Sequence, residues 1–211
     1  MTRRLLLVVA LAAAIVAEGC LGPRADQSTY FLLTSTAVPG EIPAPLSARL
    51  GLGPVTLPGY LDRSELVTRV SENQLAVSDI ERWAEPLRDN VLRALSQNLV
   101  RLLRPNDYVP YPWYESAAVD YGVAVDLTRF EADSTGSVTL DADWRITSGD
   151  PQETLYRGES LIREAANGAG TDRLVAALSR ALARLCDEIA AEVRRIHTAS
   201  GLGLEPTANA R

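Results

Sequence analysis

The chain has 211 residues, a length that suits one domain with a sizeable core or two small ones. It carries 21 basic and 27 acidic residues, which gives a formal net charge of −6. Because nucleic-acid binding needs clustered cations, this acidic balance predicts no nucleic-acid partner.

The N-terminus reads as an export signal. Two arginines precede an apolar run from Leu5 to Ala17. The run has about the length of a signal-peptide core and is shorter than the roughly 20 residues that cross a bilayer. Gly19 stands directly before Cys20, which is typical of a bacterial lipoprotein signal. We therefore expect residues 1–19 to be removed and Cys20 to be the lipid attachment site. The alternative is an ordinary secretory signal that leaves Cys20 as a free thiol.

The residue after the predicted attachment site is Leu21, not Asp. In enteric-type sorting this favours the outer membrane. We therefore expect a lipoprotein on the periplasmic face of the outer membrane, with the inner membrane as the less favoured alternative. Residues 20–28 are polar and predict a lipid-anchored tether. Acylation of Cys20 leaves Cys186, which lies in an apolar helical pattern and is expected to be a buried structural cysteine.

The first part of the body, which follows the tether, is predicted to be mostly β. Gly53-Pro54 interrupts one apolar run and predicts an edge strand or a bulge there. Pro58-Gly59 predicts the turn that follows. The expected segments are a strand at 29–33, an extended proline-rich linker at 34–47, a strand at 48–57, and a hairpin of 65–70 with 74–78.

A helical region is predicted after this hairpin. Ser78 and Glu81 have capping-box spacing and predict that a helix starts there. Pro86 predicts the first turn of a longer helix. Apolar residues then recur every three or four positions until the helix ends before Pro105. The apolar positions are Leu87, Val91, Leu95, Leu99 and Leu102.

The rest of the body alternates with strand and then helix periodicity. Residues 119–127, 138–146 and 153–163 predict an antiparallel meander with one apolar and one wet face. Thr171 or Asp172 is expected to cap a final long helix. The predicted fold class is α+β, a mostly antiparallel sheet with two long helices packed on one face. We expect residues 29–197 to form this domain and residues 198–211 to be a disordered tail.

A search for catalytic chemistry is mostly negative. His197 is the only histidine and is expected at a helix end, where it complements the helix dipole. There is no G-x-S-x-G nucleophile turn and no phosphate-binding GxxxxGK[ST] loop. Asp141 and Asp143 share a predicted strand face, which is read as a solvated face. We therefore expect no catalytic residues, no metal site and no cofactor.

Aromatic residues gather in the stretch NDYVPYPWYES, residues 106–116. Tyrosine and tryptophan give a large contact area at low entropic cost, so this stretch could be an exposed contact loop. The other interpretation is a proline-rich connection whose rings pack back on the core.

Three stretches together resemble a known family. They are LPGYLDR at 57–63, VTR at 67–69 and RWAEPL at 82–87. With the signal and the order of the other segments, they are similar to the ABC-type transport auxiliary lipoproteins, the family of paraquat-inducible protein C. The resemblance covers about residues 28–195.

The resemblance implies a non-enzymatic subunit of a lipid transport system. Members of the family accompany MCE-domain proteins, and some systems also have a permease and an ATPase. The implied role is to dock the transport assembly at the outer membrane and so to support envelope integrity. Two alternatives are a periplasmic carrier that binds a lipid itself and an assembly lipoprotein of another envelope machine.

The stretch 57–70 is the predicted contact region. An edge-like strand at Gly53-Pro54 would invite pairing with another chain, so we expect a homo-oligomer that uses this segment. The residues expected at a partner or subunit interface are Tyr60, Leu61, Asp62, Arg63, Arg69, Trp113 and Tyr114.

Overall fold

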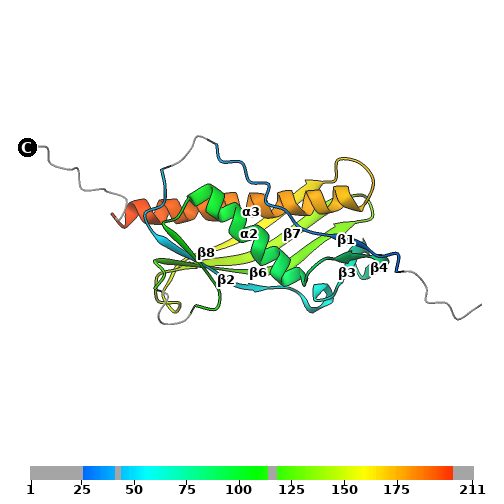
Figure 1. Cartoon of the computed structure of the whole chain (residues 1–211), viewed down its shortest axis with the longest axis horizontal. Helices are drawn as coiled ribbons and strands as arrows, with labels where there is room; N and C mark the ends of the chain where they lie inside the picture. Colours follow the sequence, from blue (N-terminus) through cyan, green and yellow to red (C-terminus); the bar gives the residue numbers. More distant parts are fainter. Residues whose placement is uncertain (1–25, 41–43, 114–117, 202–211) are drawn as a thin grey trace, which may run out of the picture.

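Eight strands form one mixed sheet, and two helices lie across one of its faces (Figure 1). The computed structural model describes residues 26–40, 44–113 and 118–201. This confirms the predicted α+β class, because the longest ladders are antiparallel. The elements are β1 (Thr29–Phe31), β2 (Arg49–Thr56), η2 (Gly59–Leu61), β3 (Glu65–Ser71), β4 (Gln74–Trp83), α2 (Leu87–Leu103), β5 (Asp107–Pro110), β6 (Tyr121–Asp133), β7 (Ser137–Thr147), β8 (Thr154–Ala165) and α3 (Thr171–Ala199).

The β6–β7–β8 meander is the framework of the sheet. Alternate residues of each strand point to the helices, so the apolar set Val123, Leu140 and Ile162 is buried. The intervening residues point to the other face, which carries no helix and includes Asp126 and Asp143. We call this the open face. The meander and the solvated position of Asp143 are confirmed.

β6 also determines where the segment 57–64 lies. One side of β6 pairs with β7, and its other side pairs in parallel with β2 near its start and with β3 near its end. β2 and β3 therefore lie one after the other along β6. The segment 57–64 bridges the gap between them.

The prediction of an edge or a bulge at Gly53-Pro54 is confirmed as a bulge. The pairing of β2 with β6 shifts register between Leu52 and Val55. The first half of β2 is not an edge, because β5, a strand that the sequence did not predict, pairs with Arg49–Leu52. Only the second half of β2 lacks a second neighbouring strand among the described residues.

The helix predicted to start at Ser78 is wrong, because residues up to Trp83 belong to strand β4. The local hydrogen bond that suggested a cap does form, since Ser78 Oγ accepts from the Glu81 amide at 3.1 Å. It lies instead in an irregular stretch where β4 has extra residues opposite β3. Pairing with β3 and with β1 stabilises the extended backbone and overrides the local signal.

The two helices cover the apolar face as predicted. α2 begins after Pro86 and ends at Arg104, which adopts a left-handed conformation before Pro105. α3 begins after Gly170 with no side-chain cap, so the predicted capping by Thr171 or Asp172 is wrong. The buried stripes of the helices supply much of the core, including Val91, Leu95, Leu99, Leu182, Leu185 and Ile189.

Residues 34–40 of the predicted linker form a strap that packs against both helices. Figure 1 shows this segment, in blue, passing over α3. Asn98 Oδ1 of α2 accepts from the Ala37 amide at 2.9 Å, and Ser179 Oγ of α3 accepts from the Thr34 amide at 3.1 Å. Leu33 and Leu46 at its two ends are fully buried. Side chains of the helices, rather than strand pairing, therefore hold this extended segment in place.

Candidate functional site

The loop 57–64 is fastened to the core at its middle. Residues Gly59–Leu61 form one 3-10 turn, in which the Leu61 amide donates to the Pro58 carbonyl at 2.9 Å. Leu61 is only 3 % exposed and belongs to the core. Its side chain therefore anchors the loop. Tyr60 hydrogen-bonds to Glu131, whereas Asp62 is exposed to solvent.

A buried carboxylate lies beneath this loop. The Glu131 side chain on β6 is fully buried, because Tyr60 and two arginines cover it on the open face. It accepts hydrogen bonds from Tyr60 Oη at 2.5 Å, from Arg69 Nε at 2.5 Å and from Arg129 Nε at 3.0 Å. We call these four residues the Glu131 cluster. It ties the loop, β3 and β6 together.

The protonation equilibria of the cluster follow from these contacts. Burial, with the hydrogen bond to Glu131 as a second cause, raises the pKa of Tyr60 to about 12. The hydrogen bond to Glu131 raises the pKa of the Arg69 guanidinium above its usual value. Tyr60 therefore stays a neutral donor and Arg69 a cation. Their contacts make them positioning residues for the loop.

Asp62 and Arg63 are the predicted site residues of this loop that solvent reaches. Both are exposed. The Asp62 carboxylate lies 3.5 Å from the Arg88 guanidinium of α2, and both side chains are about half exposed. Such a pair contributes little to stability. Arg63 forms no ion pair with the described residues and lies on a loop that the Glu131 cluster holds from below.

The stretch 82–87 also serves as a structural connector. Arg82 donates to the Glu65 carboxylate at 2.8 Å and to Ser64 Oγ at 3.1 Å. The Trp83 amide donates to the Ser64 carbonyl at 2.7 Å, and the Trp83 ring is buried. The stretch 82–87 therefore holds the two residues that connect the stretches 57–63 and 67–69.

The aromatic stretch is partly packed and partly exposed. Trp113 Nε1 donates to the Val109 carbonyl at 3.2 Å, and the ring lies on β2 and β6 where a Cβ at Gly51 or Gly122 would be 2.6 Å from it. Tyr111 meets it edge-on and is 48 % exposed. Tyr114 lies outside the described residues. Trp113 is about 30 Å along β6 from the Glu131 cluster, so the two predicted contact regions are separate.

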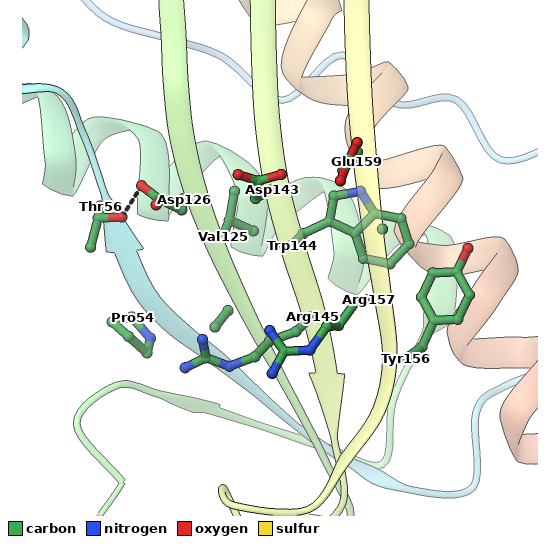
Figure 2. A pocket seen from close by; sticks show the side chains of 12 residues that line it. Pro54, Thr56, Val125, Asp126, Asp143, Trp144, Arg145, Tyr156, Arg157 and Glu159 are labelled. Atoms are coloured by element: carbon green, nitrogen blue, oxygen red, sulfur yellow. Dashed lines mark hydrogen bonds between the residues drawn. The ribbon is translucent and has the colours of Figure 1, made fainter.

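A groove of about 770 Å³ lies on the open face, and the sequence did not single it out. Its floor is the backbone of β6, β7 and β8 (Figure 2). Asp126, Asp143 and Glu159 lie opposite one another on adjacent strands, and Arg145 lies opposite Arg157. Like charges therefore form two neighbouring rows. In the sequence, an acidic residue and an arginine stand two positions apart in both β7 and β8. Only the register shows that like charges lie opposite each other.

The described residues show no arrangement suited to catalysis. Among them, no three His, Cys, Asp or Glu side chains group as metal ligands. Burial raises the pKa of the Cys186 thiol well above its usual value, as expected for an inert core cysteine. His197 is buried in the last turn of α3, 3.3 Å from Tyr121 Oη. In the part of the chain that the structure describes, no helix is long and apolar enough to cross a bilayer.

Comparison with known families decides the relationship. The profile of the ABC-type transport auxiliary lipoprotein component matches residues 30–190, most of the chain. The chain belongs to this family. As a family member it is an auxiliary lipoprotein component of ABC-type transport systems, generally non-enzymatic, and a membrane-anchored protein of the bacterial envelope. A comparison with curated proteins gave no match.

Solved structures show that the fold is shared. The protein XCC0632 from Xanthomonas campestris superposes with a TM-score of 0.70 at 17% identity, covering 83% of this chain and 99% of that one. A crystal structure of an uncharacterized protein gives 0.64 at 21% identity, covering 79% and 98%. At such identities the likeness of this auxiliary lipoprotein to both structures concerns the fold alone.

Proposed function

We propose that this auxiliary lipoprotein docks an MCE-type lipid transport assembly at the outer membrane, in the manner of paraquat-inducible protein C. The observation that carries the proposal is the family match over residues 30–190. The lipoprotein-like N-terminus and the absence of a catalytic arrangement among the described residues support a docking role. A permease and an ATPase would be further members of the same system.

The proposed anatomy follows the sequence. Residues 1–19 are the signal, acylated Cys20 begins a tether that runs to residue 28, residues 29–197 are the functional body, and residues 198–211 are a tail. Among the described residues the strands and helices run from Thr29 to Ala199, which supports a body of about this extent and extends α3 two residues past position 197.

The packing of the interior counts against the alternative of a lipid carrier. A carrier of this architecture needs a cavity between the sheet and the helices. Leu95, Leu99 and Leu185 have no exposed surface at that interface. The two best-formed hollows in the described ranges lie elsewhere, on the open face and beside the β3–β4 turn. The body therefore fits a docking element better than a carrier.

We propose Asp62 and Arg63 as the contact residues of the loop 57–64. They are exposed, whereas Tyr60 and Arg69 hold the loop from below and Leu61 anchors it in the core. Trp113, at the other end of β6, is the second proposed contact region, to which the sequence adds Tyr114. A rigid loop loses little entropy on binding, which favours affinity.

Affinity purification of the tagged full chain from its native envelope tests the role. We expect an MCE-domain protein to be enriched and expect Arg63→Glu to reduce its yield about tenfold, as reversal of a contact charge can. Arg173→Glu is the matched control, because Arg173 is exposed and lies at the start of α3, outside the loop 57–64 and the aromatic stretch. Fractionation should place the chain in the outer membrane and Cys20→Ala should release it.

If no MCE-domain protein is enriched over an unrelated lipoprotein, the proposed function is wrong. If the partner is enriched equally with Arg63→Glu, the docking role stands and the contact surface is not the loop 57–64.

A further inference from the structure

Strand β8 is a long edge of the sheet. Its pairing partner among the described residues is β7 alone. At the C-terminal end of β8, two side chains of α3 occupy outward backbone carbonyls. Arg184 donates to the Arg163 carbonyl at 3.2 Å, and Arg180 donates to the Ala165 carbonyl at 2.7 Å. Outward and inward backbone groups alternate along the regular part of the ladder, so the odd-numbered residues from Arg157 to Ala165 direct theirs away from β7. Leu155 is the extra residue at which the register with β7 shifts. No such contact covers Leu155 to Leu161 within the described ranges.

The side chains along this uncovered stretch have a symmetric order. Leu155, Arg157, Glu159 and Leu161 point to the open face, and each is exposed. Read from either end, the order is apolar, charged, charged, apolar, with Gly158 at its centre and opposite charges on its two sides. Leu161 is 62 % exposed and Leu155 is 37 % exposed, which is unusual for leucine in a sheet.

The charges of this stretch are badly placed within one chain. The register of β7 with β8 sets Arg157 opposite Arg145 and Glu159 opposite Asp143. Like charges directly opposite on a sheet destabilise it. Among the described residues neither Arg157 nor Glu159 forms an ion pair. In Figure 2 the Arg157 side chain reaches across β7 towards Arg145.

We infer that β8 pairs with β8 of a second copy of this chain, antiparallel, about a two-fold axis at Gly158. In this register Arg157 of each copy lies opposite Glu159 of the other, and Leu155 lies opposite Leu161. The contact is isologous, so each favourable pair forms twice. The second copy supplies the opposite charges that the chain itself does not provide.

The backbone selects the same register as the side chains. Arg157, Glu159 and Leu161 direct their N–H and C=O groups to the free edge. Arg157 and Glu159 of the two copies can therefore form two hydrogen-bonded pairs, about four bonds in total. A shift by two residues in either direction keeps the backbone phase but sets Arg157 against Arg157, or Glu159 against Glu159. The register centred on Gly158 is therefore the one that satisfies both backbone and charge.

A second copy fits this edge better than an unrelated strand does. An unrelated partner would need the complementary order of leucine, acid, base and leucine by coincidence, whereas this chain carries it by symmetry. This inference does not depend on the transport role, and it uses a different surface from the loop 57–64.

Cysteine cross-linking of the full chain in membranes tests the register. Two tagged chains, one with Leu155→Cys and one with Leu161→Cys, are expected to form a disulfide-linked heterodimer when co-expressed. Each variant alone is its own control, because identical positions would lie six residues, or about 20 Å, apart. Cys186 is fully buried and does not compete. No heterodimer, or equal cross-linking of either variant alone, would overturn the inference.

Charge exchange in the same cross-linking pair tests the ionic contacts. Arg157→Glu or Glu159→Arg in both chains is expected to lower the yield about tenfold, because like charges then face each other twice. The double exchange Arg157→Glu with Glu159→Arg should restore it. All these side chains are exposed, so folding is retained. Unchanged yields in the single exchanges, or no recovery in the double exchange, would contradict a pairing centred on Gly158.

Discussion

Two charged regions share the open face of the sheet and differ in where their partners are. In the Glu131 cluster, a fully buried carboxylate receives two arginines and a tyrosine from its own chain. Along β6–β8, the acidic row and the arginine row face like charges and form no ion pairs among the described residues. The first region is complete within one chain, and the second is not.

The difference shows that residues of a family motif can serve internal packing, while residues outside any motif carry the unpaired charges. Tyr60 and Arg69 belong to the stretch that carries the family resemblance, and their contacts are internal. Arg157 and Glu159 belong to no motif, and their charges remain unpaired within the described chain. Four variants compare the two regions, taken from the largest expected effect on stability to the smallest.

Removal of the buried carboxylate should have the largest effect. Glu131→Ala leaves Arg69, Arg129 and Tyr60 without their shared acceptor, and we expect the free energy of unfolding to fall by about 3 kcal/mol. Urea denaturation measures this. Glu159→Ala, an exposed glutamate of the same face, should change stability by no more than about 0.5 kcal/mol. Equal effects of the two variants would show that the contacts of Glu131 contribute no more to stability than an exposed glutamate does.

Removal of one cation of the cluster should cost less. Arg69→Ala leaves Glu131 with two donors, and we expect a loss of about 2 kcal/mol because a buried charge loses one of its partners. Arg145→Ala on β7 is the matched control and should not destabilise the fold, since Arg145 lies opposite Arg157 and loses a like-charge neighbour. Thermal and urea unfolding of both variants decide the point, and a destabilised Arg145→Ala would refute the contrast.

The tyrosine of the cluster should reveal itself at alkaline pH. The pKa of Tyr60 is about 12 when folded and close to 10 in an unfolded chain. Its contribution to stability is therefore complete below pH 10 and is lost as pH rises towards 12. Tyr60→Phe should lose about 1 kcal/mol at pH 8, from the hydrogen bond. It should then lose stability less steeply than the parent between pH 10 and 12. Parallel pH profiles would contradict this.

The smallest effect should have the opposite sign. Asp143 lies between Asp126 and Glu159 in the acidic row. Asp143→Asn removes repulsion from both sides and should stabilise the fold by about 0.5 kcal/mol. The gain should shrink in high salt, because exposed charges are screened. A loss of stability in the same urea titration would show that Asp143 has a favourable partner.

The sequence predicted those parts of the fold in which periodicity and burial agree. The stripes of α2 and α3 and the alternation of β6–β8 were sufficient for the class and the layers. It did not predict β5, because Asp107–Pro110 is short and ends in proline. It predicted a helix at Ser78–Trp83, because Ser78 and Glu81 have capping spacing and do form the local hydrogen bond. Parallel pairing of β1, β2 and β3 depends on contacts between distant residues, which one sequence pattern does not encode.

The candidate site was predicted less well, for a related reason. Tyr60 and Arg69 were predicted as interface residues, and the structure shows that both contact Glu131 within the chain. Glu131 is 62 positions beyond Arg69 and looks like an ordinary strand residue. Likewise the symmetry about Gly158 is written plainly in residues 155–161. It acquires meaning only when the structure shows that β8 is an edge and which of its residues point outwards.

The strap across the helices determines which end of the body continues into the proposed tether. The strap leads back through β1 to Asp26, at the end of the molecule that also holds the β3–β4 hairpin (Figure 1). With Cys20 acylated as proposed, the intervening residues reach at most about 20 Å. The loop 57–64 is then held close to the lipid headgroups. Trp113 lies towards the opposite end, about 30 Å farther along β6. A partner would therefore meet the two contact regions at different heights above the bilayer.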